Sequence, residues 1–317
     1  MDLQVVINTM IVLFLVLILG YGIAKFGMID PKTNKKLSAL VVNVSMPALI
    51  IASVADNVGN GTLQEVLMYL LWGTVFYAGM LGIAWILTRI MGTPVKQRGT
   101  YQFMLIFSNC SFMGYPIMES IFGSEAIFLS SIFNLPFNLL AFSYGILLIS
   151  GDGEEGTDSS SKKFEPKKLC NPGIIASLLA LLIFAVRWEM PQVFRQTFSL
   201  VGNLTTPLSM LVLGASLSFV PVRDIFREFR VYIMTIFRLF VLPMLTFIFM
   251  NWVTDSKMLI GIATLTAAMP VASMSVMLSN QYKGNTKLAS VGVFISTVCS
   301  VITIPLVAGV LSKLLQL

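Results

Sequence analysis

Ionisable side chains are scarce in this sequence. Of the 317 residues only 11% are charged, and there is no histidine. A soluble domain is about 25% charged, so this chain has too few charges to cover a water-facing surface. Because 56% of its residues are hydrophobic and its mean hydropathy is +0.85, the sequence predicts an integral membrane protein.

Cysteine is rare as well. The three cysteines, Cys110, Cys170 and Cys299, are an odd number within or beside apolar segments, so no disulfide framework is implied. Without histidine, and without clusters of cysteine or acidic residues, we expect no metal site, no other cofactor and no nucleic-acid partner. The missing histidine base and metal motif also make an intramembrane enzyme the least favoured function.

Long apolar stretches, by contrast, are abundant. A helix needs about 20 apolar residues to cross a bilayer. The sequence therefore predicts an all-α membrane protein with ten transmembrane helices, at 5–25, 36–55, 63–89, 100–122, 125–149, 171–188, 196–220, 229–252, 257–281 and 286–312.

Basic residues gather in alternate loops. Sixteen of the 21 Lys and Arg residues lie in the loops after the first, third, fifth, seventh and ninth stretches. Since cytoplasmic loops carry an excess of Lys and Arg, we expect these loops to face the cytoplasm. The sequence thus predicts a multi-pass protein of the cell membrane, with the lipid bilayer as its surroundings and both termini extracytoplasmic.

One loop, "GDGEEGTDSSSKKFEPKK", has the composition of a flexible linker. It predicts a cytoplasmic linker at 151–170 between two repeats at 1–150 and 171–317. Each half holds five expected spans, and an odd number forces such repeats to be inverted relative to one another.

Proline and asparagine recur in register in the two halves. "NVSMP" begins at Asn43 in the second stretch and "NLTTP" begins at Asn203 in the seventh, while Pro116 and Pro270 fall in the fourth and ninth. Inverted repeats with interrupted helices in matching positions are typical of secondary transporters that bind substrate near the bilayer midplane.

The stretch "SFMGYPIMES" places Gly114, Pro116 and Glu119 within six residues of an otherwise apolar segment. Because proline favours the first turn of a helix, we expect half-helices to begin at Pro116 and at Pro270. Two helix N-termini meeting at one depth form an anion site without any buried Lys or Arg. Polar side chains near these breaks and on the crossing partners are the candidate ligands: Asn43, Ser108, Asn109, Ser111, Asn203, Ser273 and Ser275.

Two charged residues within the spans have other expected roles. Glu119 is expected to line an outer vestibule, and Arg238 is expected to extend its side chain to the cytoplasmic face, or else to attract an anion or pair with a carboxylate. Apart from Glu119, no carboxylate is placed near the membrane centre, which disfavours proton coupling through a buried acid. Backbone carbonyls of the unwound segments can still bind Na⁺.

Several motifs together resemble the auxin efflux carrier family, in particular its short bacterial branch. They are "SNCSFMGYP", "NPGIIAS", "PLSMLVLGASL", and "MP" followed by "NQYKGN". The resemblance implies a scaffold domain, a crossover domain and elevator-like alternating access for organic anions. By this resemblance, Asn109 takes the place of the asparagine that contacts the substrate carboxylate. Pro116 and Pro270 match the crossing prolines. The resemblance also makes helices 1 and 2 the candidate surface of a homodimer.

The substrate implied by the resemblance depends on the branch. Plant members carry indole-3-acetate, whereas bacterial members are associated with dicarboxylates such as malate and malonate. This sequence has Val271 and Ala272 where the plant carriers have Gln-Gly, so the resemblance implies an anion site but not indole-acid specificity. Two alternatives stay open: a sodium-coupled carrier similar to bile acid symporters, and a non-transporting membrane sensor on the same scaffold.

Overall fold

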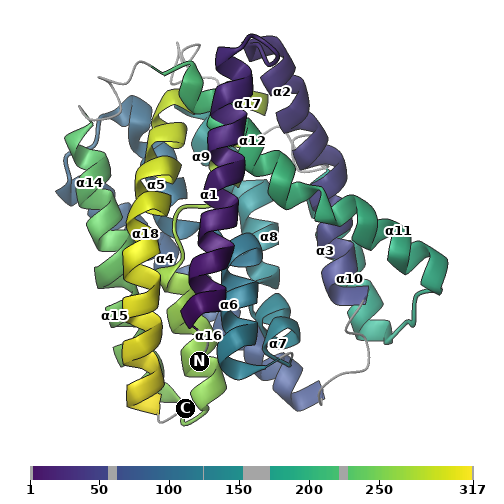
Figure 1. Cartoon of the computed structure of the whole chain (residues 1–317). Coiled ribbons are helices and arrows are strands. Elements are labelled where there is room, and N and C mark those ends of the chain that lie inside the picture. The colour runs from purple at the N-terminus through teal and green to yellow at the C-terminus, as the bar shows by residue number, and fades with distance from the viewer. Residues whose placement is uncertain (1–2, 56–62, 124, 153–171, 221–227, 316–317) are drawn as a thin grey trace.

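The structure, a computed structural model, describes residues 3–55, 63–123, 125–152, 172–220 and 228–315. Throughout these ranges every regular element is a helix, and the only strand-like pairing is one isolated bridge. Figure 1 shows the helices running roughly side by side. Six helical segments in the described part of the chain are long and apolar enough to cross a membrane: Pro31–Ala55, Gln64–Ile90, Phe128–Ser150, Gln192–Ser218, Phe229–Val253 and Thr286–Leu315.

The helices of the first half lie where the apolar stretches predict them. They are α1 (Leu3–Lys25), α2 (Pro31–Leu40), η1 (Val41–Ser45), α3 (Met46–Ala55), α4 (Leu63–Ile90), η2 (Val95–Gln97), α5 (Arg98–Ile106), η3 (Cys110–Gly114), α6 (Tyr115–Phe122), α7 (Glu125–Phe133), α8 (Leu135–Leu140), η4 (Ala141–Gly145) and α9 (Ile146–Ser150). The expected linker at 151–170 lies outside the described residues except for Gly151 and Asp152.

The rest of the described chain is helical as well. It holds α10 (Pro172–Val186), α11 (Gln192–Asn203), α12 (Thr205–Ser218), α14 (Phe229–Ile236), η6 (Phe237–Val241), α15 (Leu242–Val253), α16 (Lys257–Ala268), α17 (Met274–Gln281) and α18 (Thr286–Leu315). The start of α1 and the end of α18 lie at one end of the molecule, which we call the terminal end (Figure 1).

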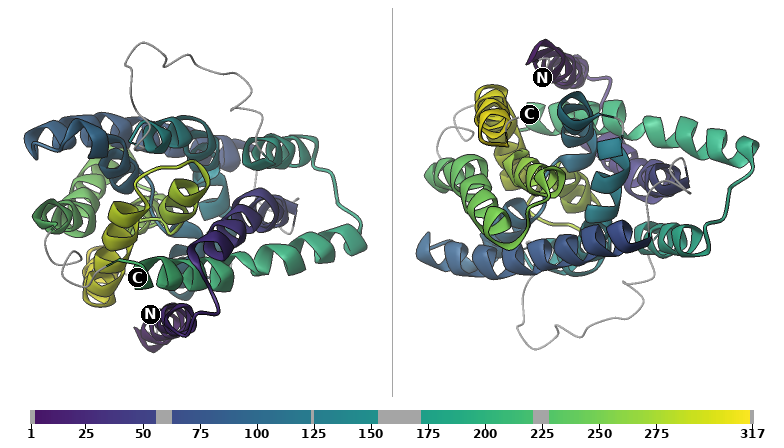
Figure 2. Two further views of the ribbon diagram at one scale, coloured as in Figure 1. Left: turned by 90° about the horizontal axis from the view of Figure 1, so that it is seen from above. Right: turned by 90° about the horizontal axis from the view of Figure 1, so that it is seen from below.

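The helices form two groups by their contacts. In the first, the panel group, α1 packs along α12, and α3 packs against α10 and α11. In the second, the crossing group, α4 packs on α5 and α7, α15 on α16, and α17 on α18. Figure 2 shows the two groups from above and from below.

Glycine brings α1 and α12 into backbone contact. A side chain at Gly214 would overlap the carbonyl oxygen of Leu17, and one at Gly20 would overlap the backbone of Leu211. Small residues permit this close approach of helices where the hydrophobic effect contributes little to their association. The panel group is therefore held by direct packing of the first helix of one half against a helix of the other.

Proline widens several helices by one residue. Among the described residues there are four π-helical turns, and three of them end two residues before a proline: η1 before Pro47, η3 before Pro116 and η6 before Pro243. A proline cannot donate a hydrogen bond to the carbonyl four residues earlier, and its ring crowds that carbonyl. A wider turn relieves the crowding, and such turns are frequent at functional sites.

Candidate functional site

The fourth expected span is interrupted, but not where its glycine and proline lie. Helix α5 ends at Ile106, and Phe107 is extended, with φ −100° and ψ 118°. The helix resumes at Cys110 as the turn η3 and continues without a break into α6. Gly114 and Pro116 both lie inside this resumed helix, so the expectation that they mark the break is wrong. Proline here widens the helix and does not start it.

The ninth expected span is interrupted at its proline. Helix α16 ends at Ala268, and Met269 is extended, with φ −67° and ψ 146°. Helix α17 begins at Met274 with Ser273 as its N-cap residue. Pro270 lies within this interruption, four residues before the start of α17, so the expectation that a half-helix begins at Pro270 is wrong. Its missing N–H group is compatible with extended backbone.

The two interruptions cross and pair with each other. Ser108 and Val271 form an antiparallel bridge. Beside it, the N–H of Asn109 donates to the carbonyl oxygen of Pro270 at 2.8 Å, and the N–H of Ala272 donates to that of Phe107 at 3.1 Å. Unwound backbone at membrane depth needs such internal partners. The pairing therefore fixes where the four half-helices meet.

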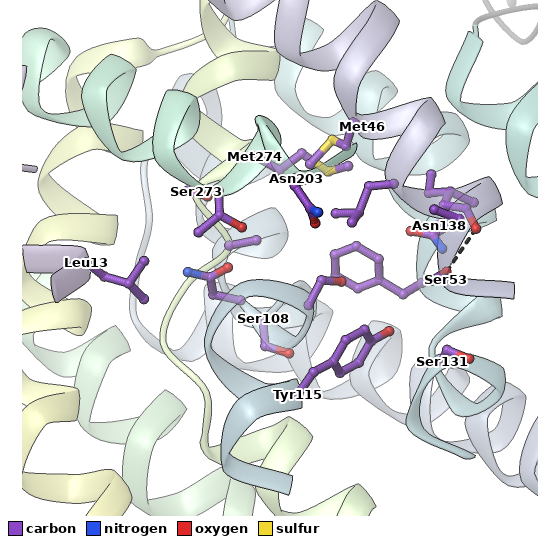
Figure 3. Close-up of a pocket in the computed structure, with 18 of the residues that line it drawn as sticks. Leu13, Met46, Ser53, Ser108, Tyr115, Ser131, Asn138, Asn203, Ser273 and Met274 are labelled. Carbon is purple, nitrogen blue, oxygen red and sulfur yellow. Dashed lines mark hydrogen bonds between the residues drawn. The ribbon is translucent and has the colours of Figure 1, made fainter. Parts of the chain in front are cut away.

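A cavity of about 670 Å³ opens beside this crossing, between the panel group and the crossing group. Figure 3 shows Ser273, Asn203 and Tyr115 around it from three different helices. Its lining is Asn8, Val12, Leu13, Met46, Leu49, Ile50, Ala52, Ser53, Ser108, Asn109, Ser111, Tyr115, Glu119, Ser131, Phe137, Asn138, Ser199, Asn203, Thr206, Ala272, Ser273 and Met274.

Three buried polar groups on the cavity wall lack a partner. The Oγ of Ser108, the Nδ2 of Asn109 and the Oγ of Ser273 accept or donate no hydrogen bond within the described part of the chain. These side chains are at most 3% exposed. An unpaired buried polar group costs about 1–3 kcal/mol, so their presence around a hollow indicates a ligand or water that satisfies them.

The helix termini at the crossing add electrostatic polarity to the wall. Neither Asn109 before η3 nor Ser273 before α17 closes its helix with a side-chain hydrogen bond. The first N–H groups of a helix have no partner within that helix, and its N-terminus carries about half a positive charge. The sole acidic residue in the described lining is Glu119, and Lys and Arg are absent from that lining. The electrostatics of the crossing therefore favour a negatively charged ligand.

Most of the expected site residues meet at this cavity, but two do not. Ser108, Asn109, Ser111, Asn203, Ser273 and Glu119 line it. Asn43 lies elsewhere, with its Oδ1 accepting from the Nε2 of Gln281 at 3.2 Å. Ser275 is buried in the first turn of α17 but does not line the cavity. The two asparagines that share a motif thus occupy different surroundings.

The side of the crossing away from the terminal end is closed by amide and hydroxyl groups. The Nδ2 of Asn280 donates to the Oγ of Ser38 at 3.0 Å, next to the contact between Gln281 and Asn43. These bonds join α17 of the crossing group to α2 and η1. None of these four residues lines the cavity, so the contacts lie beyond its wall on that side.

Comparison with known proteins decides the family. The model of the family described as "Membrane transport protein" matches residues 5–308. The chain belongs to this family of membrane transport proteins. The resemblance to auxin efflux carriers is confirmed at that level. The protein is thus a multi-pass membrane transporter, and its family implies a carrier and not an enzyme.

Two archaeal relatives of this membrane transport protein cover nearly its whole length. An uncharacterized transporter of Methanocaldococcus jannaschii is 27% identical over 308 residues, which is 94% of this chain and 96% of the relative. An uncharacterized transporter of Methanothermobacter thermautotrophicus is 25% identical over 308 residues, covering 96% of this chain and 98% of the relative. Both similarities run through the linker and both halves.

Arg238 corrects another expectation about this transport protein. Its side chain is fully buried and does not extend to the cytoplasmic face. The guanidinium donates from Nε to the carbonyl of Met269 at 3.2 Å and from Nη1 to the carbonyl of Leu105. The crossing therefore does contain a buried cation, on the side of the C-terminal ends of α5 and α16.

Several lining residues of the transport protein were not expected from the sequence. Tyr115, Phe137 and Asn138 approach the cavity from α6 and α8. A polar residue within an apolar span is a usable signal, and Asn138 provides it. The aromatic residues carry no such signal, because an apolar ring in a membrane span is equally suited to face lipid, protein or a cavity.

Proposed function

We propose that the protein is a secondary transporter of small organic carboxylates, with the anion bound where the two interrupted helices cross. The observation that carries this proposal is the convergence of three unpaired buried groups, on Ser108, Asn109 and Ser273, at one wall of a cavity. They come from both interruptions, so one anion would bind both half-helix pairs together.

The chemistry of these groups fits a carboxylate. The amide Nδ2 of Asn109 is a donor, and each serine hydroxyl can donate. Together with the N-terminus of α17 they offer hydrogen bonds and partial positive charge to an anion. Ser53, Ser131 and Asn138, elsewhere on the wall, can hydrogen-bond a second polar group of the ligand. Dicarboxylates of the malate and malonate type are therefore the substrates we favour.

The finer architecture belongs to the same proposal. We assign ten spans in two inverted repeats, 1–150 and 171–317, joined by a cytoplasmic linker at 151–170. Both termini would be extracytoplasmic, so the cavity would open to the outside of the cell membrane. The panel group would act as a scaffold within a homodimer formed through the first two spans, and the crossing group would carry the anion past it as an elevator.

Ligand-induced thermal stabilisation tests the site directly, since only a bound ligand raises apparent stability. We expect malate or malonate, among a panel of mono- and dicarboxylates, to stabilise the purified protein. Asn109→Ala should abolish this shift. Asn251→Ala is the matched control, because Asn251 is an exposed asparagine of α15 that does not line the cavity, and it should keep the shift. Equal shifts in both variants would remove Asn109 from the site.

Uptake by proteoliposomes then separates the remaining functions. A carrier moves the bound acid across the bilayer. Saturable binding without flux would instead indicate a sensor, and uptake that requires Na⁺ would indicate a carrier similar to the bile acid symporters.

A further inference from the structure

A buried arginine contacts the backbone of the crossing. Arg238 lies in the π turn η6, which ends two residues before Pro243. Its side chain is 0% exposed. A charge so placed is strongly unfavourable in a membrane protein unless it has partners. Its hydrogen-bond partners are two backbone carbonyls, and no carboxylate forms an ion pair with it in the described part of the chain.

Both partner carbonyls lie at helix C-termini. Leu105 is the penultimate residue of α5, and Met269 is the C-cap residue of α16. The C-terminal end of a helix has carbonyls without intrahelical partners and carries about half a negative charge. Two such ends together offset the charge of one guanidinium, although its Nη2 group has no hydrogen-bond partner among the described residues.

The same contacts bear on the anion site. With its two ends of partial negative charge neutralised, the crossing keeps only the positive ends of η3 and α17 facing the cavity. The guanidinium also joins α5 to α16 directly beside the bridge between Ser108 and Val271. It therefore holds the backbone that carries Asn109 and Ser273.

We propose that Arg238 is the positioning residue of the crossing: it joins the C-terminal ends of α5 and α16, fixes the pairing of the two unwound segments, and leaves a net positive field at the cavity. Two experiments test this role. Only the second, which measures malonate binding, rests on the proposed function.

The first arm measures the geometry of the crossing without any substrate. Cys110 is the first residue of the resumed helix and is 1% exposed. In a chain with Cys170 and Cys299 replaced by alanine, N-ethylmaleimide should react slowly with Cys110. Arg238→Met, and to a lesser degree Arg238→Gln, should raise this rate at least tenfold, because the crossing loses its link.

A matched control separates this effect from general loss of stability. Gly214→Ala perturbs the packing of α1 on α12, and neither helix belongs to the interrupted spans that form the crossing. It should lower the melting temperature without raising the alkylation rate of Cys110. If Arg238→Gln alkylates no faster than the control at equal melting temperature, Arg238 does not hold the crossing and the proposal fails.

The second arm measures the field with malonate as the probe. Arg238→Lys keeps the charge but offers a single ammonium group in place of the planar fork, and Arg238→Gln removes the charge. Loss of hydrogen bonds to a charged group predicts about tenfold weaker malonate binding for Lys and about a hundredfold for Gln. If Arg238→Gln binds malonate as tightly as the wild-type protein, Arg238 does not contribute to a positive field at the cavity.

The alkylation and malonate-binding experiments also distinguish a failure of the proposed Arg238 role from a failure of the proposed function. If malonate does not bind the unmodified protein while the alkylation rates follow the expected order, the substrate assignment fails and the positioning role stands. If Arg238→Met does not fold, the Lys and Gln variants decide the alkylation arm.

Discussion

The N-terminus of α5 is capped by a side chain, whereas the helix N-termini at the crossing are not. At the start of α5, the carboxylate of Asp152 accepts hydrogen bonds from the N–H groups of Gly99, at 3.0 Å, and Thr100. At the starts of η3 and α17 no side chain closes the helix. The protein thus caps one helix start with its own carboxylate, whereas no side chain caps the two beside the cavity. At α17 the N–H groups of Ser275 and Val276 donate to the backbone carbonyls of Ala272 and Ser273 instead.

The difference shows how the fold prepares an anion site. Asp152 demonstrates the chemistry that a helix start in this chain accepts: a carboxylate bound by successive backbone N–H groups. Ser273 is short, and its hydroxyl finds no partner among the described residues. Under the proposed function, the Ser273 hydroxyl and the partial positive charge of the α17 N-terminus would attract a substrate carboxylate there. The predictions below change one member of this comparison at a time.

The largest effect is expected from placing a carboxylate at the open helix start. Ser273→Asp puts a negative charge at the N-cap of α17, where it would interact favourably with the partial positive charge of the helix end. We expect malonate affinity to fall at least about a hundredfold, since two like charges cannot share the site, while the melting temperature rises. Titration by thermal shift measures both. Ser273→Asn, which is neutral and similar in size, should lose much less affinity; equal losses would show a steric effect instead.

The converse change removes the carboxylate from the closed helix start. Asp152→Ala leaves the N–H groups of Gly99 and Thr100 unpaired and should destabilise the protein by about 1–2 kcal/mol. The measurement is the thermal unfolding midpoint, with malonate affinity as the internal control. Affinity should stay within twofold, because Asp152 is remote from the cavity lining. A large loss of affinity with normal stability would contradict the comparison.

A smaller effect is expected at the closed side of the crossing. Gln281→Ala removes the hydrogen bond to Asn43, which contributes about 0.5–1.5 kcal/mol. If the cavity alternates between two sides, weakening this seal shifts the population toward the other side and changes uptake several-fold. Labelling of a cysteine introduced at Ser38 should increase in parallel. Unchanged labelling would mean that this contact does not seal the closed side.

The smallest effect concerns the acid in the cavity lining. Glu119 is exposed, so its charge is screened by salt. Glu119→Gln should raise malonate affinity about twofold at low ionic strength and leave it unchanged at high salt. Loss of uptake in this variant, with binding intact, would instead assign Glu119 a part in coupling.

Much of this fold was predictable because membrane helices carry their signal locally. Apolar stretches about 20 residues long located the helices, and Pro270 lies in the ninth interruption. The fourth interruption was misplaced by several residues, because Pro116 can either start a helix or follow a π turn and the sequence alone does not distinguish them. Gly114, which is helical, instead gives room to the side chain of Met269, since a Cβ at this position would lie 3.3 Å from the Cγ of that methionine.

Long-range contacts account for the other differences. Arg238 bonds to Leu105 and Met269, which lie 133 and 31 residues away along the chain. Nothing near Arg238 in the sequence indicates these carbonyls, so snorkelling to the membrane surface was the expectation. Asn43 and Asn203 share a motif, yet only Asn203 lines the cavity. A motif shared by two segments does not determine which of its copies reaches a cavity, because that depends on the packing of each segment.

The backbone contact between α1 and α12 also constrains the order in which the chain assembles. Gly20 meets Leu211, about 190 residues later. At a synthesis rate of about 5–20 residues per second, the first helix waits roughly 10–40 seconds in the bilayer before its partner emerges. During that interval its glycine face is covered by lipid or by an insertion factor, so substitutions at Gly20 should reduce the yield of assembled protein in cells more than they reduce the stability of molecules that have matured.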